Sequence, residues 1–246
     1  MIKPEIRKGR YMKKVSVVSG GSSGLGLEIA GHLVKNGKNT IILGRDSKRL
    51  SEAGKRLNKN TGDSFIESFT CNIGNEGDIR RLGQYLSDNG LVPEYLFNNA
   101  GRGLFAKAES STSEMTDSVF EANLKGMILL TSLMLRITPA EEKLTIINIM
   151  STSAITGRAE ESIYCAAKWG ARGYTEALRA ELKGTKRDII AVYPGGMKTE
   201  FWNLADNRRD ISGFMDPCEV AEKIFNAVSG SSRLLVSDLT INRIQK

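Results

Sequence analysis

Short runs rich in β-branched residues alternate with longer stretches of helical periodicity along almost the whole chain. Seven of these runs have the length and composition of buried strands. They cover residues 15–19, 40–43, 65–70, 95–98, 144–149, 189–193 and 234–237. Because such alternation builds right-handed β-α-β units, the pattern predicts an α/β fold: a doubly wound parallel sheet of about seven strands flanked by helices.

The length of the chain favours one domain. At 246 residues it shows no internal repeat, no low-complexity linker and no abrupt change of composition. We therefore predict a basic extension at residues 1–13 and one domain at 14–246. Residues 152–162 and 198–213 are irregular and follow strands, where open α/β sheets bind ligands. These two intervals are the predicted walls of a substrate pocket.

The net charge of +7 is concentrated at one end of the chain. Residues 1–14 carry six basic side chains and one acidic side chain, so they account for +5 of it. A nearly balanced domain with a solvated basic terminus gives no reason to expect a nucleic-acid partner. No run approaches the roughly 20 apolar residues of a membrane helix, so we expect no membrane partner either.

The cysteine and histidine content argues against a metal site. Cys71, Cys165 and Cys218 lie far apart, and His32 is the only histidine. That arrangement fits neither a zinc site nor a disulfide framework, and we interpret His32 as structural. The absence of paired cysteines is typical of a reducing compartment, so the expected location is the cytoplasm.

A glycine-rich turn follows the first predicted strand, with glycines at Gly20, Gly21, Gly24 and Gly26 and a helical run after it. Glycines let backbone N–H groups approach a pyrophosphate, and the next helix presents the positive end of its dipole to the same group. Such a turn can also be a plain tight connection. Its place between a strand and a helix favours dinucleotide binding.

A second pattern places Tyr164 and Lys168 four residues apart in a predicted helix, on one face. A tyrosine pKa is ordinarily about 10, and bringing it near 7 takes roughly 4 kcal/mol of phenolate stabilisation. A nearby ammonium group and a cationic nicotinamide are sources of that stabilisation. Alone, the pair is also typical of any amphipathic surface helix.

Together, the GxxxGxG spacing from Gly20 to Gly26, the tetrapeptide 98–101 (Asn-Asn-Ala-Gly) and the Tyr164/Lys168 pair resemble the short-chain dehydrogenase/reductase family over essentially the whole chain. The resemblance implies a Rossmann-type fold and an oxidoreductase that transfers hydride between a nicotinamide and a carbonyl or alcohol. It also implies a homodimer or homotetramer, because family members commonly pair the helix that carries the tyrosine.

The cofactor preference depends on the end of the second strand. In the family, an acidic residue there favours NAD, and a small residue followed by arginine favours NADP; this chain has Gly44 and Arg45. A guanidinium group can hold a 2′-phosphate through a planar fork, whereas a carboxylate would repel it. We predict NADP (NADPH), with NAD less favoured. Asp46 leaves an alternative open, because it can cap the next helix or reach a ribose hydroxyl.

The remaining cofactor contacts are assigned by the same resemblance. Asn72 stands where the family usually has aspartate, which weakens the predicted adenine contact at that position. Pro194 and Thr199 belong to a segment that lies along the nicotinamide in the family. The predicted cofactor-binding residues are Gly20, Ser22, Ser23, Gly24, Leu25, Gly26, Arg45, Asn72, Ile73, Asn99, Ala100, Gly101, Tyr164, Lys168, Pro194, Gly195, Met197 and Thr199.

Four residues match the catalytic positions of the family: Asn123, Ser151, Tyr164 and Lys168. By resemblance, Ser151 binds the substrate oxygen and Tyr164 transfers its proton. Lys168 holds the nicotinamide ribose and lowers the tyrosine pKa, and Asn123 anchors a water of the proton relay. Ser153 is the poorer candidate for the serine role because it lies only eleven residues before the tyrosine.

The sequence leaves the substrate open. The main hypothesis is an NADP-dependent carbonyl reductase or alcohol dehydrogenase, and the alternative is a dinucleotide-binding sensor without turnover. The complete set of four catalytic residues favours the enzyme. Mixed apolar and charged side chains are candidates for the pocket, namely Arg102, Phe105, Arg158, Glu160, Phe201, Trp202, Phe214 and Met215.

Overall fold

The computed structural model describes residues 12–59, 62–205, 210–229 and 234–244. Residues 1–11 of the predicted basic extension lie outside this range, as do residues 206–209 of the predicted substrate wall. Lys13, assigned by sequence to the extension, is already the first residue of the first strand.

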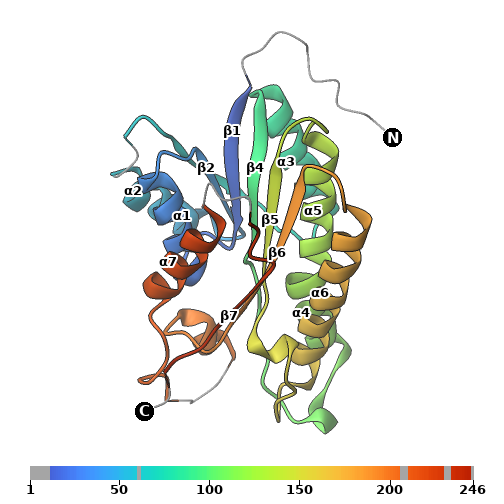
Figure 1. Cartoon of the computed structure of the whole chain (residues 1–246). Helices are drawn as coiled ribbons and strands as arrows, with labels where there is room; N and C mark the ends of the chain where they lie inside the picture. The colour runs from blue at the N-terminus through green and yellow to red at the C-terminus, as the bar shows by residue number, and fades with distance from the viewer. Residues whose placement is uncertain (1–11, 60–61, 206–209, 230–233, 245–246) are drawn as a thin grey trace.

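Seven parallel strands form one twisted sheet (Figure 1). Their order is β3-β2-β1-β4-β5-β6-β7, with every neighbouring pair parallel. The strands are β1 Lys13–Ser19, β2 Thr40–Gly44, β3 Ile66–Thr70, β4 Leu91–Asn98, β5 Leu144–Ile149, β6 Arg187–Pro194 and β7 Asp238–Ile241. The doubly wound parallel sheet predicted from the alternating pattern is thereby confirmed.

Helices cover both faces of the sheet. Helices α1, α2 and α7 pack on one face, and α3, α4, α5 and α6 lie on the other (Figure 1). Their bounds are α1 Gly24–Lys35, α2 Ser47–Asn58, α3 Glu76–Asp88, α4 Ser113–Phe120, α5 Gly126–Ile137, α6 Ser162–Glu181 and α7 Pro217–Val228. Successive strand residues such as Val17 and Val18 are both fully buried, one in each core. This two-sided burial explains the continuous apolar runs of the strands.

The helices α4 and α5 are joined by a π-helical turn, η2 Glu121–Lys125. The continuous stretch Ser113–Ile137 has 25 residues and is long and apolar enough to cross a membrane by length and composition. By those criteria the expectation that no such stretch exists is wrong. Leu130 and Met134 of this stretch are fully buried in the core beneath the sheet.

The first half of β4 was missed by sequence because Pro93 lies inside it. The pairing register of β1 with β4 shifts between Val15 and Ser16, so that Val15 faces Pro93 and Ser16 faces Tyr95. A proline is tolerated in a strand at such an irregularity, since one residue is left out of the ladder there.

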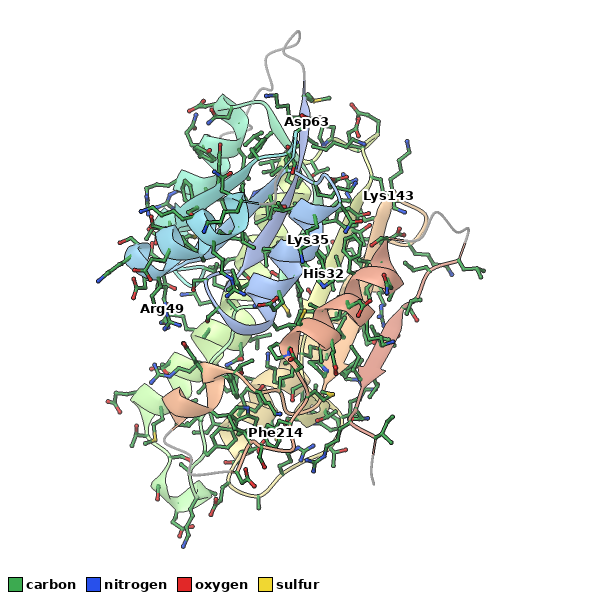
Figure 2. The ribbon with its side chains drawn as sticks, turned by 90° about the vertical axis from the view of Figure 1, so that its left-hand side faces the viewer. His32, Lys35, Arg49, Asp63, Lys143 and Phe214 are labelled. Atoms are coloured by element: carbon green, nitrogen blue, oxygen red, sulfur yellow. The ribbon has the colours of Figure 1, made fainter. Side chains whose placement is uncertain are left out.

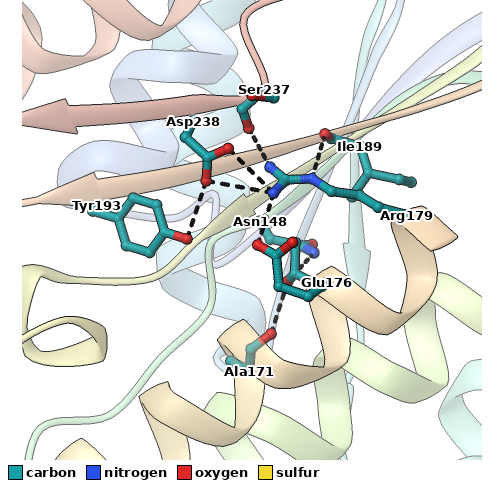
Figure 3. Close-up of polar contacts among 9 residues, drawn as sticks. Asn148, Ala171, Glu176, Arg179, Ile189, Tyr193, Ser237 and Asp238 are labelled. Atoms are coloured by element: carbon teal, nitrogen blue, oxygen red, sulfur yellow. Dashed lines mark hydrogen bonds and ion pairs between the residues drawn. The ribbon is translucent and has the colours of Figure 1, made fainter.

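The seventh strand was misplaced by sequence. We expected it at residues 234–237, but it covers Asp238–Ile241, and Leu234 is 85% exposed. Polar contacts hold the true strand against α6: Arg179 forms an ion pair with Asp238 at 3.2 Å and donates to the Ser237 carbonyl (Figure 3). Arg179 also pairs with Glu176 of its own helix at 2.8 Å. The prediction relied on the apolar character of residues 234–237 alone and therefore selected the wrong segment.

His32 lies on α1 with its ring 5.8 Å from that of Phe225 on α7. In Figure 2 His32 lies near the middle of the view, well above Phe214. The stacked contact supports the structural interpretation of this histidine.

Candidate active site

A cleft of about 1570 Å³ opens at the carboxyl ends of the strands. Typical small-molecule pockets measure roughly 300–1,000 Å³, so this cleft has room for a dinucleotide and a second molecule. Residues from both irregular intervals predicted by sequence line it, including Arg158 and Phe201. Every predicted cofactor-binding residue except Gly26 also lines it.

The glycine-rich turn connects β1 to α1 and needs its glycines for two different reasons. Gly20 and Gly24 have φ angles of +66° and +53°, in the left-handed region that favours glycine. At Gly26 a β-carbon would lie 2.3 Å from the Gly20 carbonyl oxygen. Gly26 therefore lets the helix pack under the turn and does not line the cleft, and its contact with a cofactor stays a prediction.

The N-terminus of α1 differs from those of helices α2, α3 and α7. Helices α2, α3 and α7 are each capped by a side chain, from Asp46, Asn75 and Asp216. Ser23 at the start of α1 makes no such hydrogen bond, and the first turn holds no acidic residue. The N–H groups of this turn and the helix dipole therefore fit an anionic phosphate group from the cleft.

The segment after β4 fastens the turn to the sheet. Asn99 donates from its side chain to the Ser19 carbonyl at 3.0 Å, and the backbone N–H groups of Asn99 and Ala100 donate to the Ser19 hydroxyl. Asn98 is buried and donates to Thr131 and Asn148. The segment therefore both supports the sheet and forms one border of the cleft.

Arg45 lies at the end of β2, exposed at the edge of the cleft. Its guanidinium has no hydrogen bond or ion pair with the residues that the structure describes. Asp46 caps α2 by accepting from the Arg49 N–H at 3.0 Å, so its side chain takes the first of the two alternatives left open by sequence. An unpaired guanidinium with no neighbouring carboxylate directed at it suits a 2′-phosphate.

Asn72 follows β3 and lines the cleft with Ile73. Its side-chain amide donates to Glu121 at 3.2 Å, and its carbonyl oxygen accepts from the Gly74 N–H at 3.1 Å. Asn72 thus shapes the loop beside the predicted adenine site, and its contact with adenine stays a prediction.

Tyr164 and Lys168 stand on the first turns of α6, both facing the cleft. Tyr164 is 6% exposed and Lys168 is 4% exposed, with the Lys168 Nζ 5.8 Å from the tyrosine ring centre and 3.4 Å from the Ile149 carbonyl oxygen. Helical spacing therefore does bring the two groups together.

The electrostatics of this pair differ from the expectation. Burial raises the pKa of Tyr164 above its ordinary value, while a hydrogen bond with Ser151 opposes that rise. Burial also lowers the pKa of Lys168 to about 8. The groups of the protein alone therefore keep the tyrosine protonated, and the lowered tyrosine pKa that the resemblance implied is not produced by Lys168 on its own.

Ser151 lies two residues after the end of β5. Its side chain accepts from the Ser153 N–H at 3.0 Å and caps the short 3₁₀ turn η3 Thr152–Ala154. Ser151 lines the cleft beside Tyr164. The Ser153 hydroxyl points to Glu161 instead, donating to its carboxylate at 3.0 Å. This geometry favours Ser151 for contact with a substrate oxygen.

Asn123 lies in the π-helical turn η2, a feature often found at functional sites. Its side chain donates to the carbonyls of Arg102 at 2.8 Å and Val119 at 2.9 Å and accepts from the Arg102 N–H. It does not line the cleft, but a β-carbon at Gly101 would lie 2.8 Å from its oxygen and 3.6 Å from the Lys168 Nζ. Asn123 is therefore close to Lys168, and its water-anchoring role stays a prediction.

Aromatic rings form the wall opposite the catalytic groups. The Phe105 and Trp202 rings stack 5.3 Å apart, and Phe201 lies 5.8 Å from the Tyr164 ring. Phe201 and Trp202 belong to the 3₁₀ helix η4 Glu200–Ala205. Of the eight predicted pocket residues, seven line the cleft, and Glu160 does not.

The segment after β6 borders both halves of the cleft. The Gly195 N–H donates to the Ile241 carbonyl, and Met197 pairs with Met215. Thr199 lies over the glycine-rich turn, since a β-carbon at Gly24 would be 3.1 Å from its methyl group. Pro194, Gly195, Met197 and Thr199 all line the cleft, as the sequence predicted.

The family model described as short chain dehydrogenase matches residues 14–210, most of the chain and all four predicted catalytic residues. The chain belongs to the short-chain dehydrogenase/reductase family. The Rossmann-type sheet and the nicotinamide-dependent oxidoreductase chemistry expected from the sequence are typical of this family.

Individual relatives agree with this assignment. A solved short-chain dehydrogenase/reductase from Vibrio parahaemolyticus is 32% identical, with a TM-score of 0.82 over 94% of this chain and 100% of that chain. Sepiapterin reductase from Chlorobaculum tepidum is 26% identical over 94% of this chain and 96% of its own length. An actinorhodin polyketide ketoreductase solved with NADPH is 26% identical, with a TM-score of 0.82 over 93% of this chain and 95% of that chain.

Sequence reasoning missed several residues of this dehydrogenase/reductase cleft. Arg49, in the first turn of α2 and four residues after Arg45, lines the same cleft and is ion-paired with Glu200 of η4. Glu161 lines the substrate end, and so does Arg243 near the end of the chain. The helical spacing of Glu161 from Tyr164 was a usable signal for that residue. Arg243 had none, because its position depends on the loop at Gly213, whose carbonyl it contacts.

Proposed function

We propose that this short-chain dehydrogenase/reductase is an NADPH-preferring enzyme that reduces a carbonyl to an alcohol, or runs the reverse reaction. One observation carries the proposal: Ser151, Tyr164 and Lys168 converge at one end of a cleft whose other end holds the glycine-rich turn and Arg45. A hydride donor bound along that cleft would present its nicotinamide to the serine and tyrosine.

The dinucleotide supplies the hydride when it is bound. The chain would hold its phosphates at the uncapped N-terminus of α1 and its 2′-phosphate at Arg45. Ser151 would donate a hydrogen bond to the substrate oxygen, and the Tyr164 hydroxyl would give that oxygen its proton. Lys168 would hold the nicotinamide ribose beside Tyr164. The protonated state favoured by burial of Tyr164 suits the proton donor of a reduction.

Within the part of the chain that the structure describes, the Arg45 guanidinium is unpaired and no carboxylate is directed at it, which favours NADPH over NADH. Polyketide ketoreductase, one relative of this chain, was solved with NADPH, and another relative is called sepiapterin reductase. Both names describe reductases, which supports carbonyl reduction as the proposed direction.

A homodimer or homotetramer is part of the same proposal. On α6, Trp169 is 48% exposed and a β-carbon at Gly173 would meet no atom within 4 Å. Gly170 of the same helix instead packs on Leu124 of its own chain. The open side of α6 supports pairing with a second copy. The free cysteines at positions 71, 165 and 218 support a reducing, cytoplasmic setting.

The proposed function is tested by following oxidation of NADPH and of NADH by the purified protein across a panel of ketones and aldehydes. The panel should span acidic, sugar-like, aromatic and lipophilic carbonyls, because aromatic rings and arginines line the same cleft. We expect turnover with at least one class and a higher kcat/KM for NADPH. Binding of NADPH without turnover on any carbonyl would instead favour the sensor hypothesis.

A further inference from the structure

A carboxylate that the proposed chemistry does not use is buried beside Tyr164. Glu161 is 2% exposed, immediately precedes α6 and lines the substrate end of the cleft. It does not cap its own helix through its side chain. A buried carboxylate is costly unless it is paired or hydrogen-bonded. The groups that Glu161 contacts therefore indicate the role of this residue.

The Glu161 carboxylate reaches Ser151 through one intervening residue. It accepts from the Ser153 hydroxyl at 3.0 Å, and the Ser153 N–H donates to the Ser151 side-chain oxygen at 3.0 Å. With one lone pair of the Ser151 oxygen occupied by that N–H, its own proton is left to point elsewhere. The two hydrogen bonds therefore fix the orientation in which Ser151 can donate to a substrate oxygen.

The same carboxylate also acts on Tyr164, three residues along the helix. Burial is the largest cause that raises the tyrosine pKa, the Ser151 hydrogen bond lowers it, and the negative charge of Glu161 raises it further. A carboxylate in this position opposes formation of a phenolate.

Few other charges face Tyr164. On its own helix these are Cys165, which raises the tyrosine pKa, and Lys168, whose Nζ lies 5.8 Å from the ring. Arg158, on the loop before the helix, lowers it. The other segments packed around the ring contribute the apolar side chains Val119, Leu104, Phe105 and Phe201.

We infer that Glu161 is a positioning residue for the proposed reaction: its buried carboxylate orients Ser151 through Ser153 and sets Tyr164 to donate a proton rather than to accept one. The inference rests on the proposed function and deepens it, because it assigns a preferred direction. A carbonyl that gains negative charge during reduction meets a serine proton and a tyrosine proton together. Alcohol oxidation, which needs the phenolate, is disfavoured by the same group.

The test is the pH profile of kcat for carbonyl reduction with NADPH in the full-length protein. Its basic limb reports loss of the Tyr164 proton. In Glu161→Gln the amide oxygen can still accept from Ser153, but the charge is gone. We expect the basic limb to move down by about half a pH unit or more. Glu161→Asp keeps the charge and should leave the limb near its wild-type position.

Glu160→Gln is the matched control, because Glu160 is the adjacent exposed glutamate and does not line the cleft. Its basic limb should stay in place. Ser153→Ala tests the orienting path alone, because it removes the hydroxyl that bonds Glu161 and keeps the Glu161 charge. The basic limb should therefore stay in place. The value of kcat should fall about tenfold, because the turn that orients Ser151 is no longer tied to Glu161.

A readout without turnover separates this inference from the proposed function. Isotope-labelled tyrosine, assigned with Tyr164→Phe, reports the Tyr164 titration by NMR in the complex with NADP⁺. If Glu161→Gln leaves both this titration and the basic limb unchanged, Glu161 does not control the protonation state of Tyr164. Unchanged kcat in Ser153→Ala overturns the orienting path, and that variant decides the question if Glu161→Gln fails to fold. If no carbonyl is reduced, the proposed function fails, and the NMR titration still decides the effect of Glu161.

Discussion

Replacing Arg45 by alanine tests the proposed cofactor preference. Its guanidinium is exposed and has no partner among the described residues, so the substitution breaks no internal ion pair and the loss falls on the ligand. One charge-assisted hydrogen bond contributes about 1.5–3 kcal/mol, and solvent exposure places this contact at the lower end of that range. At about 1.4 kcal/mol for each tenfold change, Kd for NADPH should rise roughly 10- to 30-fold.

The assay is a fluorescence titration of the protein with NADPH and with NADH at fixed ionic strength. NADH has a hydroxyl group in place of the 2′-phosphate, so its Kd should change by about twofold at most. Arg49→Ala is the control, because Arg49 lines the same end of the cleft but is ion-paired with Glu200. In that variant, the change in Kd for NADPH should differ less from the change in Kd for NADH than it does in Arg45→Ala. Equal weakening of NADPH and NADH by Arg45→Ala would refute the role given to this arginine.

Two further predictions concern stability. Arg179→Ala should lower the free energy of unfolding by about 1–2 kcal/mol in urea titrations, because it removes the contacts with Asp238 that link α6 to β7. The exposed Arg80→Ala should cost under about 0.5 kcal/mol, and equal losses would contradict the anchoring role. For Lys168, burial lowers the pKa to about 8 from 10.5, so between these values the unfolded chain binds more protons and stability rises with pH. Without dinucleotide, the free energy of unfolding of Lys168→Met should exceed that of the wild type by up to about 3 kcal/mol near pH 7. This difference should shrink as the pH rises through 8 towards 10. A difference that does not depend on pH would contradict the cost assigned to burial of the charged amine.

The fold was largely predictable because its signals are local. A strand buried on both faces, such as β2 or β5, is largely apolar and stands out against the helices beside it. The partly buried edge strand β3 was located as well, so six of the seven strands were found at least in part. The errors have physical causes as well. Pro93 hid the first half of β4 at a register shift. In β7, exposed residues alternate with partly buried ones, and Arg179 of α6 pairs with Asp238 at its start.

The candidate site was predictable where its chemistry follows helical or turn spacing. The glycine-rich turn and the pair Tyr164 and Lys168 are of this kind, and all but Gly26 of the predicted cofactor set line one cleft. Other features depend on tertiary contacts that a sequence does not encode locally. The link from Glu161 through Ser153 to Ser151 is one. The pKa of Tyr164 is another, since burial raises it by more than the hydrogen bond with Ser151 lowers it.

The most direct measurement of the central claim is carbonyl reduction by Tyr164→Phe. The ring is kept, so packing against Phe105 and Phe201 should persist and Kd for NADPH should stay close to the wild-type value. Loss of the proposed proton donor should lower kcat by about 10²- to 10⁴-fold. Normal turnover by this variant, on a substrate that the wild-type protein reduces, would contradict the assignment of Tyr164 as the catalytic acid.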